Sequence, residues 1–293
     1  MSSLKQGVIK RAGLDDIELR EIQHLAALCN KRDCTDLKLN WNILRSRPKD
    51  QINDFLFYYD GYLVGFLALF AFNQQEGEIS GMVHPAHRGR NIFKMLLKAA
   101  SEEARDRGLP SLLLIVEQAS YNGQEVVHRL PVTHDHSEYK MVLEQPRLPE
   151  TFNERLLFRP STVEDIPVMA QITAQAFEIP DEGEVNWYTA ESFSQSNRLY
   201  FVGEVDGVVV GKVDVNLSED AGFILGLAVR SEHQGLGYGR QILARTVQEI
   251  YRTGRQNISL EVSTVNKQAL SLYQSCGFKE TGSYDYYRLP LDS

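Results

Sequence analysis

Strand-like and helix-like patterns of apolar residues alternate along the second half of the chain. Alternating or short continuous apolar runs predict strands over 156–159, 199–216, 223–229 and 258–262, with 199–216 forming a hairpin. Apolar residues at helical spacing predict helices over 165–177, 237–253 and 269–276, and a last hairpin is expected over 278–289. Strands interleaved with helices are typical of a layered α/β unit.

The first half repeats this order at a spacing of 146 residues. Asp60-Gly61 separates two strand patterns in 57–65, and Asp206-Gly207 does the same in 203–211. Asp-Gly supplies the two positive φ angles that a two-residue hairpin turn requires. The same spacing relates further pairs of residues, namely Val83 to Val229, Arg88 to Gln234, Arg90 to Leu236, Leu97 to Leu243 and Leu114 to Leu260. An internal duplication explains a constant spacing over so many elements.

The duplication predicts two domains, 1–146 and 147–293. The 293 residues and 33.3 kDa suit two units of ordinary domain size. The connector is expected at 145–153, where Pro146 and Pro149 interrupt any regular element. We refer to these halves as the first and second repeats.

The net charge of −8 is unevenly distributed, since the second repeat carries −7 of it. This balance argues against a nucleic-acid partner, because binding to a phosphate backbone needs clustered Lys and Arg. The acidic second repeat is compatible with a cationic substrate, but an acidic surface that only maintains solubility is the preferred explanation of the charge. The longest apolar run, 66–72, is too short to span a bilayer, and the first residues lack the apolar core of a signal peptide. We therefore expect a cytoplasmic protein without a membrane partner.

No metal site or disulfide is expected. The three cysteines, Cys29, Cys34 and Cys276, show no paired spacing and are expected to be free buried thiols. His134 and His136 form a His-x-His pair without a third ligand at a useful spacing, so we expect them in a hairpin loop.

A glycine-rich segment follows the predicted strand 223–229 and precedes the helix 237–253. It reads Gln234-Gly235-Leu236-Gly237-Tyr238-Gly239-Arg240. Such a turn exposes backbone N–H groups at the positive end of the helix dipole, which suits a pyrophosphate, although a tight connection without a ligand is the alternative. A dinucleotide-binding unit is disfavoured, because its glycine loop would follow the first strand of the domain rather than the fourth.

Two motifs in this repeat resemble the GCN5-related N-acetyltransferase superfamily. Residues 229–240 have the form V-x(4)-Q-G-x-G-x-G-R, similar to the acetyl-CoA motif of that family, whose core is [QR]-x-x-G-x-[GA]. Residues 266–278 have the form N-x-x-A-x-x-L-Y-x-x-x-G-F, similar to the next motif of the family. The duplication further resembles tandem acetyltransferases. The implied fold is two tandem α/β domains, each a twisted, mostly antiparallel sheet with a central parallel pair, flanked by helices.

The resemblance implies acetyl-CoA as co-substrate, with no metal. The backbone amides of Gln234, Gly235, Leu236, Gly237, Tyr238, Gly239 and Arg240 would hold its pyrophosphate. Backbone groups of Leu227 and Val229 would bond the pantetheine arm where their strand separates from the next strand. Asn266 would bond the pantetheine or pyrophosphate region, a role compatible with capping its helix.

The implied reaction is attack of a neutral amine on the thioester, which needs a proton acceptor for the amine and a proton donor for the departing thiolate. Tyr273 stands at the acid position of the family, and a buried helical aromatic is the alternative reading. Glu261 is the candidate base, because Leu260-Glu261-Val262 followed by that Tyr resembles ribosomal-protein N-terminal acetyltransferases. An outward-facing strand Glu is equally consistent, and Asp214, Glu219 or a water chain remain alternatives.

The acceptor is expected to be a primary amine of a small molecule or a peptide N-terminus. Acidic residues follow the first helix of the second repeat, where this family usually forms a wall of its acceptor cleft; they are Glu178, Asp181, Glu182 and Glu184. They would attract an ammonium group, although a solvated loop explains them as well.

The first repeat departs from both motifs. Asn91 and Phe93 occupy the positions of Gly237 and Gly239, and Val127 stands opposite Tyr273. Asn tolerates left-handed backbone, whereas Phe beside a pyrophosphate would crowd it. We expect this repeat to be a degenerate copy and the second repeat to carry the chemistry. A non-catalytic acyl-CoA-binding sensor or assembly protein is the alternative function.

Overall fold

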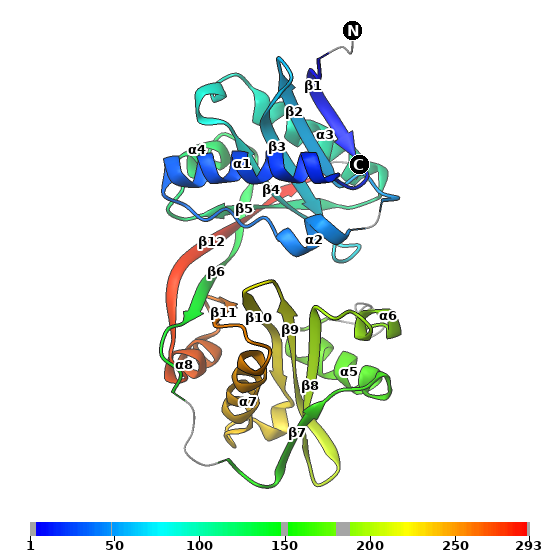
Figure 1. Ribbon diagram of the computed structural model, residues 1–293, viewed down its shortest axis with the longest axis vertical. Coiled ribbons are helices and arrows are strands. Elements are labelled where there is room, and N and C mark those ends of the chain that lie inside the picture. Colours follow the sequence, from blue (N-terminus) through cyan, green and yellow to red (C-terminus); the bar gives the residue numbers. More distant parts are fainter. Residues whose placement is uncertain (1–3, 48, 148–151, 180–187, 292–293) are drawn as a thin grey trace. The chain divides into compact units, whose positions relative to one another are not determined.

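The computed structural model describes residues 4–47, 49–147, 152–179 and 188–291 (Figure 1). The chain forms two compact units. The first unit contains residues 1–137 and 282–293, and the second contains residues 138–281. The units therefore differ from the halves expected from the repeat, because the last strand of each repeat ends in the other unit.

The first unit is built on six strands in the order β1-β2-β3-β4-β5-β12. Only β4 and β5 run parallel; the other neighbours are antiparallel. Its elements are β1 (Gly7–Arg11), α1 (Asp16–Asp33), α2 (Trp41–Ser46), β2 (Asp54–Tyr59), β3 (Tyr62–Phe70), β4 (Gly77–Val83), the short helix η1 (Pro85–His87), α3 (Ile92–Asp106), β5 (Ser111–Glu117), α4 (Tyr121–Val127) and the end of β12 (Phe278–Pro290).

The second unit has the corresponding order β6-β11-β10-β9-β8-β7, with β10 and β11 as its parallel pair. Its elements are the end of β6 (Thr133–Leu143), β7 (Leu156–Pro160), η2 (Val163–Asp165), α5 (Ile166–Ala176), α6 (Ala190–Phe193), β8 (Arg198–Val205), β9 (Val208–Leu217), β10 (Ala221–Val229), η4 (Ser231–His233), α7 (Tyr238–Arg252), β11 (Asn257–Ser263) and α8 (Lys267–Ser275). The expected fold class, with a central parallel pair in each mostly antiparallel sheet, is confirmed.

The prediction of a terminal hairpin in each repeat is wrong. Residues 278–290 form one strand, β12, which pairs with β5 from Tyr284↔Glu117 to Pro290↔Ser111. Likewise β6 is one strand that pairs with β11. A hairpin would pair each strand with its own chain neighbour, whereas here each repeat supplies the strand beside the parallel pair of the other. His134 and His136 accordingly lie on a strand and not in a loop.

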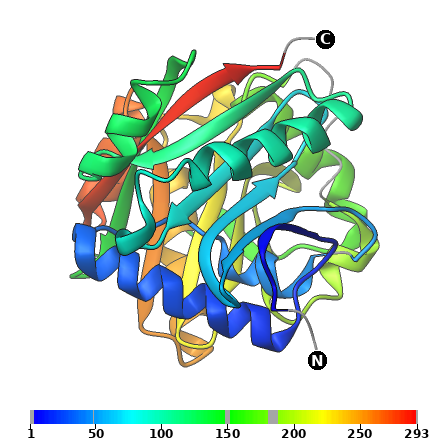
Figure 2. The ribbon, with the colours of Figure 1, turned by 90° about the horizontal axis from the view of Figure 1, so that it is seen from above.

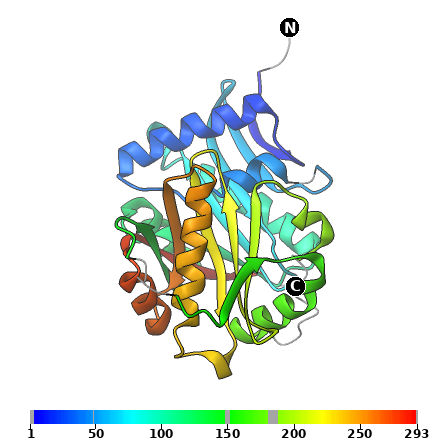
Figure 3. The same cartoon turned by 60° about the horizontal axis from the view of Figure 1, so that its bottom comes forward.

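Helices cover both faces of each sheet. In the first unit, Phe55 and Phe57 pack in the core with α3, while the alternate residues Leu56 and Tyr58 pack in the core with α1. Figure 2 shows α1 and α3 on either side of the strands. In the second unit, α7 runs across one face of the sheet (Figure 3), and α5 contacts β9 and β10.

Both Asp-Gly turns have the expected geometry. Asp60 and Gly61 have φ angles of 49° and 82°, and Asp206 and Gly207 have φ angles of 51° and 80°. Positive φ at both central residues defines the turn type whose twist matches a β-hairpin. Two cysteines, Cys29 and Cys276, are buried thiols as expected, but Cys34 is exposed, where it ends α1 in a left-handed conformation.

Candidate functional site

Strands β10 and β11 separate part-way along their length. Their parallel register runs from Ala221↔Asn257 to Ile224↔Leu260, although β10 continues to Val229 and β11 to Ser263. Beyond Ile224 the facing backbone groups of the two strands are therefore not paired with each other. This leaves the inner edge of β10, including Leu227 and Val229, able to pair with an extended ligand.

The glycine-rich loop lies at the end of β10 and begins α7. Gly235 and Gly237 have φ angles of 74° and 83°, and Gly237 caps the helix in a left-handed conformation. No heavy atom lies within 4 Å of the position a Cβ would take at either glycine. Tyr238, by contrast, is buried in the core and anchors the first turn of the helix. The loop therefore leads into the N-terminus of a 15-residue helix with open space at Gly235 and Gly237, whereas the N–H of the predicted residue Gln234 already donates to the carbonyl of Ser231 at 3.2 Å.

The polar side chains of this region bond to the protein itself. Gln234 donates from Nε2 to the carbonyl of Val229 at 3.0 Å, and Arg240 donates from Nη2 to Oγ of Ser275 at 2.6 Å. Oδ1 of Asn266 accepts the N–H of Ala269 at 3.0 Å, so Asn266 is the cap of α8. The capping role of Asn266 is thus observed, and its bond to a ligand stays a prediction.

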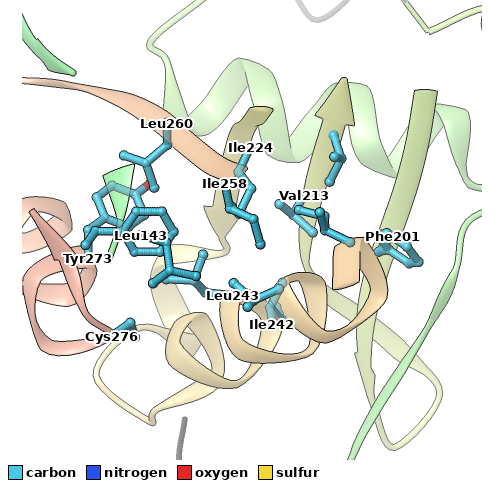
Figure 4. Close-up of a cluster of buried hydrophobic side chains, with 14 of the residues drawn as sticks. Leu143, Phe201, Val213, Ile224, Ile242, Leu243, Ile258, Leu260, Tyr273 and Cys276 are labelled. Atoms are coloured by element: carbon cyan, nitrogen blue, oxygen red, sulfur yellow. The ribbon is translucent and has the colours of Figure 1, made fainter. Parts of the chain in front are cut away.

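Tyr273 projects from α8 into the core of the second unit. Figure 4 shows its side chain among apolar residues that include Leu260 and Leu143. It is 8% exposed, and burial raises the pKa of its hydroxyl to about 12, with a smaller contribution from Cys276. Among the described residues its hydroxyl has no hydrogen-bond partner. A buried phenol without a partner retains its capacity to donate a hydrogen bond.

Glu261 is the first residue of β11 beyond the last pair with β10. Its neighbours Leu260 and Val262 are buried in the core with α7, so Glu261 lies on the other face of the sheet. There it is half-buried and opposite Lys140 of β6. Asp214 of β9 also lies on this face, because Val213 and Val215 are in the core with α7. The structure thus brings two of the candidate bases to one face beside the strand separation.

A buried polar cluster on this face was not predicted. Lys212 and Asp214 are 1% and 6% exposed, and Nζ of Lys212 donates to Oδ2 of Asp214 at 2.8 Å. The hydroxyl of Tyr188 donates to the same Oδ2 at 2.7 Å and accepts a hydrogen bond from Lys212. Thr173 Oγ1 of α5 lies 3.2 Å from the Tyr188 hydroxyl. The sequence signal that was available is that Lys212 and Asp214 replace apolar residues of the first repeat.

A family model described as "Acetyltransferase (GNAT) family" matches the chain twice, at residues 18–129 and 166–278. The chain belongs to the GNAT acetyltransferase family. The two matches confirm the tandem arrangement of two GNAT repeats. Membership of this family identifies the protein as an acetyltransferase.

Relatives of several kinds match this GNAT chain. It is 27% identical over 144 residues to aminoglycoside N(6')-acetyltransferase type 1 of Stenotrophomonas maltophilia, covering 46% of this chain and 93% of that protein. It is 25% identical over 267 residues to mycothiol acetyltransferase of Nocardiopsis dassonvillei, covering 80% of each. It is 29% identical over 99 residues to probable N-acetyltransferase family 8 member 5 of Mus musculus, covering 32% of this chain and only 44% of that protein.

The fold is also similar to solved GNAT structures. The GCN5-related N-acetyltransferase of Sphaerobacter thermophilus matches with a TM-score of 0.79 at 18% identity, covering 99% of this chain and 98% of that one. At this identity the likeness shows the fold alone.

The loop of the first GNAT repeat that corresponds to the glycine-rich loop has the same backbone conformation. Gly89 and Asn91 have φ angles of 75° and 60°, so Asn91 takes the left-handed conformation of Gly237. A groove of about 680 Å³ lies beside this loop and the separated ends of β4 and β5. Phe93 lines it, with a ring atom 3.1 Å from where a Cβ of Gly81 would lie.

The side chains of this first loop differ from those of the second. Arg88 donates from Nε to the carbonyl of Val83 at 3.1 Å, the counterpart of the bond from Gln234 to Val229. Its other nitrogens bond both carboxylate oxygens of Asp33, at 2.9 and 2.6 Å. The positive charge of the Arg88 guanidinium is therefore already balanced by the carboxylate of Asp33.

The acidic segment expected on the acceptor side is described only at its start. Glu178 is exposed, with a φ of 54°, whereas Asp181, Glu182 and Glu184 lie outside the described residues. Within residues 4–47, 49–147, 152–179 and 188–291, no group of three His, Cys, Asp or Glu residues is placed to hold a metal ion. In the same part of the chain, every helix is too short or too polar to cross a membrane.

Proposed function

We propose that the second unit transfers the acetyl group of acetyl-CoA to a primary amine of a small molecule or a peptide N-terminus. One observation carries this proposal: an open glycine loop, a strand separation and the buried Tyr273 occur together in one unit. The aminoglycoside acetyltransferase among the relatives supports an amine acceptor.

Acetyl-CoA would bind through the backbone. The amides of 235–240 would hold its pyrophosphate at the N-terminus of α7, since the N–H of Gln234 already donates to the carbonyl of Ser231. Asn266, the cap of α8, would bond the pantetheine or pyrophosphate region. Leu227 and Val229 would bond the pantetheine amides along the unpaired edge of β10, which places the thioester near the point where β10 leaves β11.

The chemistry needs two groups on opposite sides of the thioester carbon. Glu261 would accept the proton of the acceptor ammonium, which frees the lone pair of the amine. The amine then forms the amide bond with the acetyl carbon as the carbon–sulfur bond breaks. Tyr273 would donate a hydrogen bond to the departing thiolate, and the second proton, which the amine nitrogen releases as the amide forms, would convert this thiolate to the thiol of CoA.

An acetyl-transfer assay with the whole chain tests this function. Acetyl-CoA is the donor, and the acceptors are a panel of aminoglycosides, small amines and peptides. Release of the CoA thiol is followed by a thiol-reactive dye, and the acetylated product is identified by its mass. We expect thiol release above the amine-free rate with at least one acceptor, and a slower rate in Glu261→Gln. Binding of acetyl-CoA without release across the panel would favour the acyl-CoA sensor instead.

The groove of the first unit supports a second role there, which is binding of an acyl-CoA without transfer. The supporting features are the left-handed Asn91 and the groove volume of about 680 Å³. Val127, at the position of Tyr273, offers no proton donor. Calorimetric titration with acetyl-CoA distinguishes one binding site from two, and a stoichiometry of one would refute this second role.

A further inference from the structure

Strand β10 contains a β-bulge in the second unit. Its register with β9 shifts between Leu225↔Asp214 and Ala228↔Lys212, so Gly226 and Leu227 face the single residue Val213. The corresponding strand β4 pairs with β3 in an unbroken register from Phe70↔Glu78 to Gly65↔Val83. The second repeat therefore holds one additional residue at this place. An extra residue in a strand is left unpaired and redirects the backbone around it.

The bulge rests directly on the buried ion pair. A Cβ added at Gly226 would lie 2.5 Å from Nζ of Lys212 and 2.9 Å from Oδ2 of Asp214. Gly226 has a φ of 58°, in the left-handed region that favours glycine. Lys212 and Asp214 are the two residues that flank Val213 on β9, so the pair supports the bulge on both sides.

The first repeat provides an internal comparison. At the spacing of 146 residues, Phe66 and Ala68 take the places of Lys212 and Asp214, and both are fully buried among apolar residues. The ion pair and the bulge thus occur together in one repeat and are both missing from the described strands β3 and β4 of the other. A buried ion pair usually adds little stability compared with well-packed apolar residues. Its presence therefore points to a role in shaping the backbone.

The place of the bulge links it to the reaction. It begins two residues beyond Ile224, the last residue of β10 that pairs with β11. Leu227, whose backbone is proposed to bond the pantetheine arm, is itself part of the bulge. The thioester would lie against this segment.

Two donors of the cluster converge on one carboxylate oxygen of Asp214. Lys212 and Tyr188 both donate to Oδ2 of Asp214, while Oδ1 is buried and has no hydrogen-bond partner in the part of the chain that the structure describes. Two hydrogen bonds to the same oxygen fix the orientation of the Asp214 carboxylate, with Oδ2 against Gly226 of β10.

We propose that Lys212, Asp214 and Tyr188 are positioning residues that hold the bulge at Gly226 and Leu227 in the geometry needed for acetyl transfer. The proposal rests on the proposed function for its link to catalysis. Its structural part, that the cluster sets the backbone of the bulge, stands independently of any activity.

Two isosteric or near-isosteric substitutions, Lys212→Met and Asp214→Asn, test the proposal in the full-length chain. The first readout is the ¹H–¹⁵N chemical shifts of the Gly226 and Leu227 amides, which report local backbone geometry without a substrate. We expect both amides to shift in each variant. Lys279→Met is the matched control, because Lys279 is an exposed lysine of the same unit paired only at the surface with Glu144.

The second readout is kinetic. Misplacement of the bulge should lower kcat for acetyl transfer by about 10- to 100-fold. The Kd for CoA should rise by a smaller factor than kcat falls, because the bulge would bond only the pantetheine arm while the loop 234–240 would still hold the pyrophosphate. Assays run well below the Tm of each variant separate this effect from loss of folded protein. A purely structural role would lower Tm and leave kcat of the folded fraction unchanged.

A double-mutant cycle adds an internal check. Gly226→Ala places its methyl group against Nζ of Lys212, and Lys212→Ala removes that contact. If the two positions act together, the combined loss of kcat is smaller than the product of the single losses.

The outcomes separate the two proposals. Unmoved Gly226 and Leu227 amides in both variants would overturn the positioning role, and so would moved amides with unchanged kcat. A wild-type protein that releases no thiol with any acceptor would refute the proposed function, while the amide shifts would still decide whether the cluster sets the bulge.

Discussion

Removal of the Tyr273 hydroxyl is the sharpest test of the proposed chemistry. In Tyr273→Phe the ring keeps its place in the core, and only an oxygen without a hydrogen-bond partner among the described residues is lost. Stability should therefore change little. The pyrophosphate loop is formed by 234–240, so affinity for CoA should also be preserved.

The expected loss of rate follows from the pKa of this hydroxyl. Burial raises that pKa to about 12, whereas an ordinary thiol has a pKa of about 8.5. Complete proton transfer from Tyr273 to the thiolate is therefore uphill, and its contribution is a hydrogen bond to the developing negative charge. Such a bond is worth about 1.5–3 kcal/mol, which corresponds to a fall in kcat of roughly 10- to 100-fold.

The assay is steady-state thiol release at saturating acceptor, with kcat and KM measured from pH 6 to 9, and CoA affinity measured by calorimetry. Tyr251→Phe is the control, because Tyr251 is a partly buried tyrosine that packs against the core in which Tyr273 is buried. A kcat for Tyr273→Phe equal to that of the wild type over this pH range would remove Tyr273 from the mechanism.

Three further substitutions test other parts of the structure. Gly237→Trp should abolish CoA binding to the second unit, since a side chain in this left-handed position would fill the loop; retained binding by calorimetry would place the phosphates elsewhere. Gly277→Ala should lower the free energy of unfolding by about 2–5 kcal/mol in urea denaturation, because its Cβ would lie 1.8 Å from the carbonyl oxygen of Gln145 at a φ of +99°; a loss under about 1 kcal/mol would show that the contact relaxes easily. Burial raises the pKa of Asp54 to about 6 despite the neighbouring Arg47, so this carboxyl stabilises the fold below its unfolded pKa, and that contribution is lost as pH rises through 6. Asp54→Asn should remove about 3 kcal/mol of this pH dependence between pH 4 and 7, and an unchanged slope in unfolding experiments would contradict the assignment.

Features specified by a few neighbouring residues were predictable from the sequence. The Asp-Gly turns, the glycine loop and the helices α7 and α8 each depend on local backbone preferences. The left-handed conformation of Asn91 follows the same logic, because Asn tolerates the backbone that its glycine counterpart adopts.

Features that depend on pairing between distant strands were not predictable. The apolar pattern over 278–289 indicates extended structure, which we predicted as a hairpin, but it carries no information about the partner strand. The role of Lys212 needed the register of β9 with β10, since only that register places its amine against Gly226. Tyr188 comes from a separate segment, and its link to Asp214 exists only in three dimensions.

The shared closing strands bear on any attempt to divide this protein. A fragment ending at residue 146 would keep β6 but lose the β11 edge that it covers, and its own β5 would lack β12. A sheet edge with unpaired backbone N–H and C=O groups pairs readily with strands of other chains. Each half made alone should therefore associate or aggregate, and co-expression of both fragments should be required to recover a soluble, closed pair.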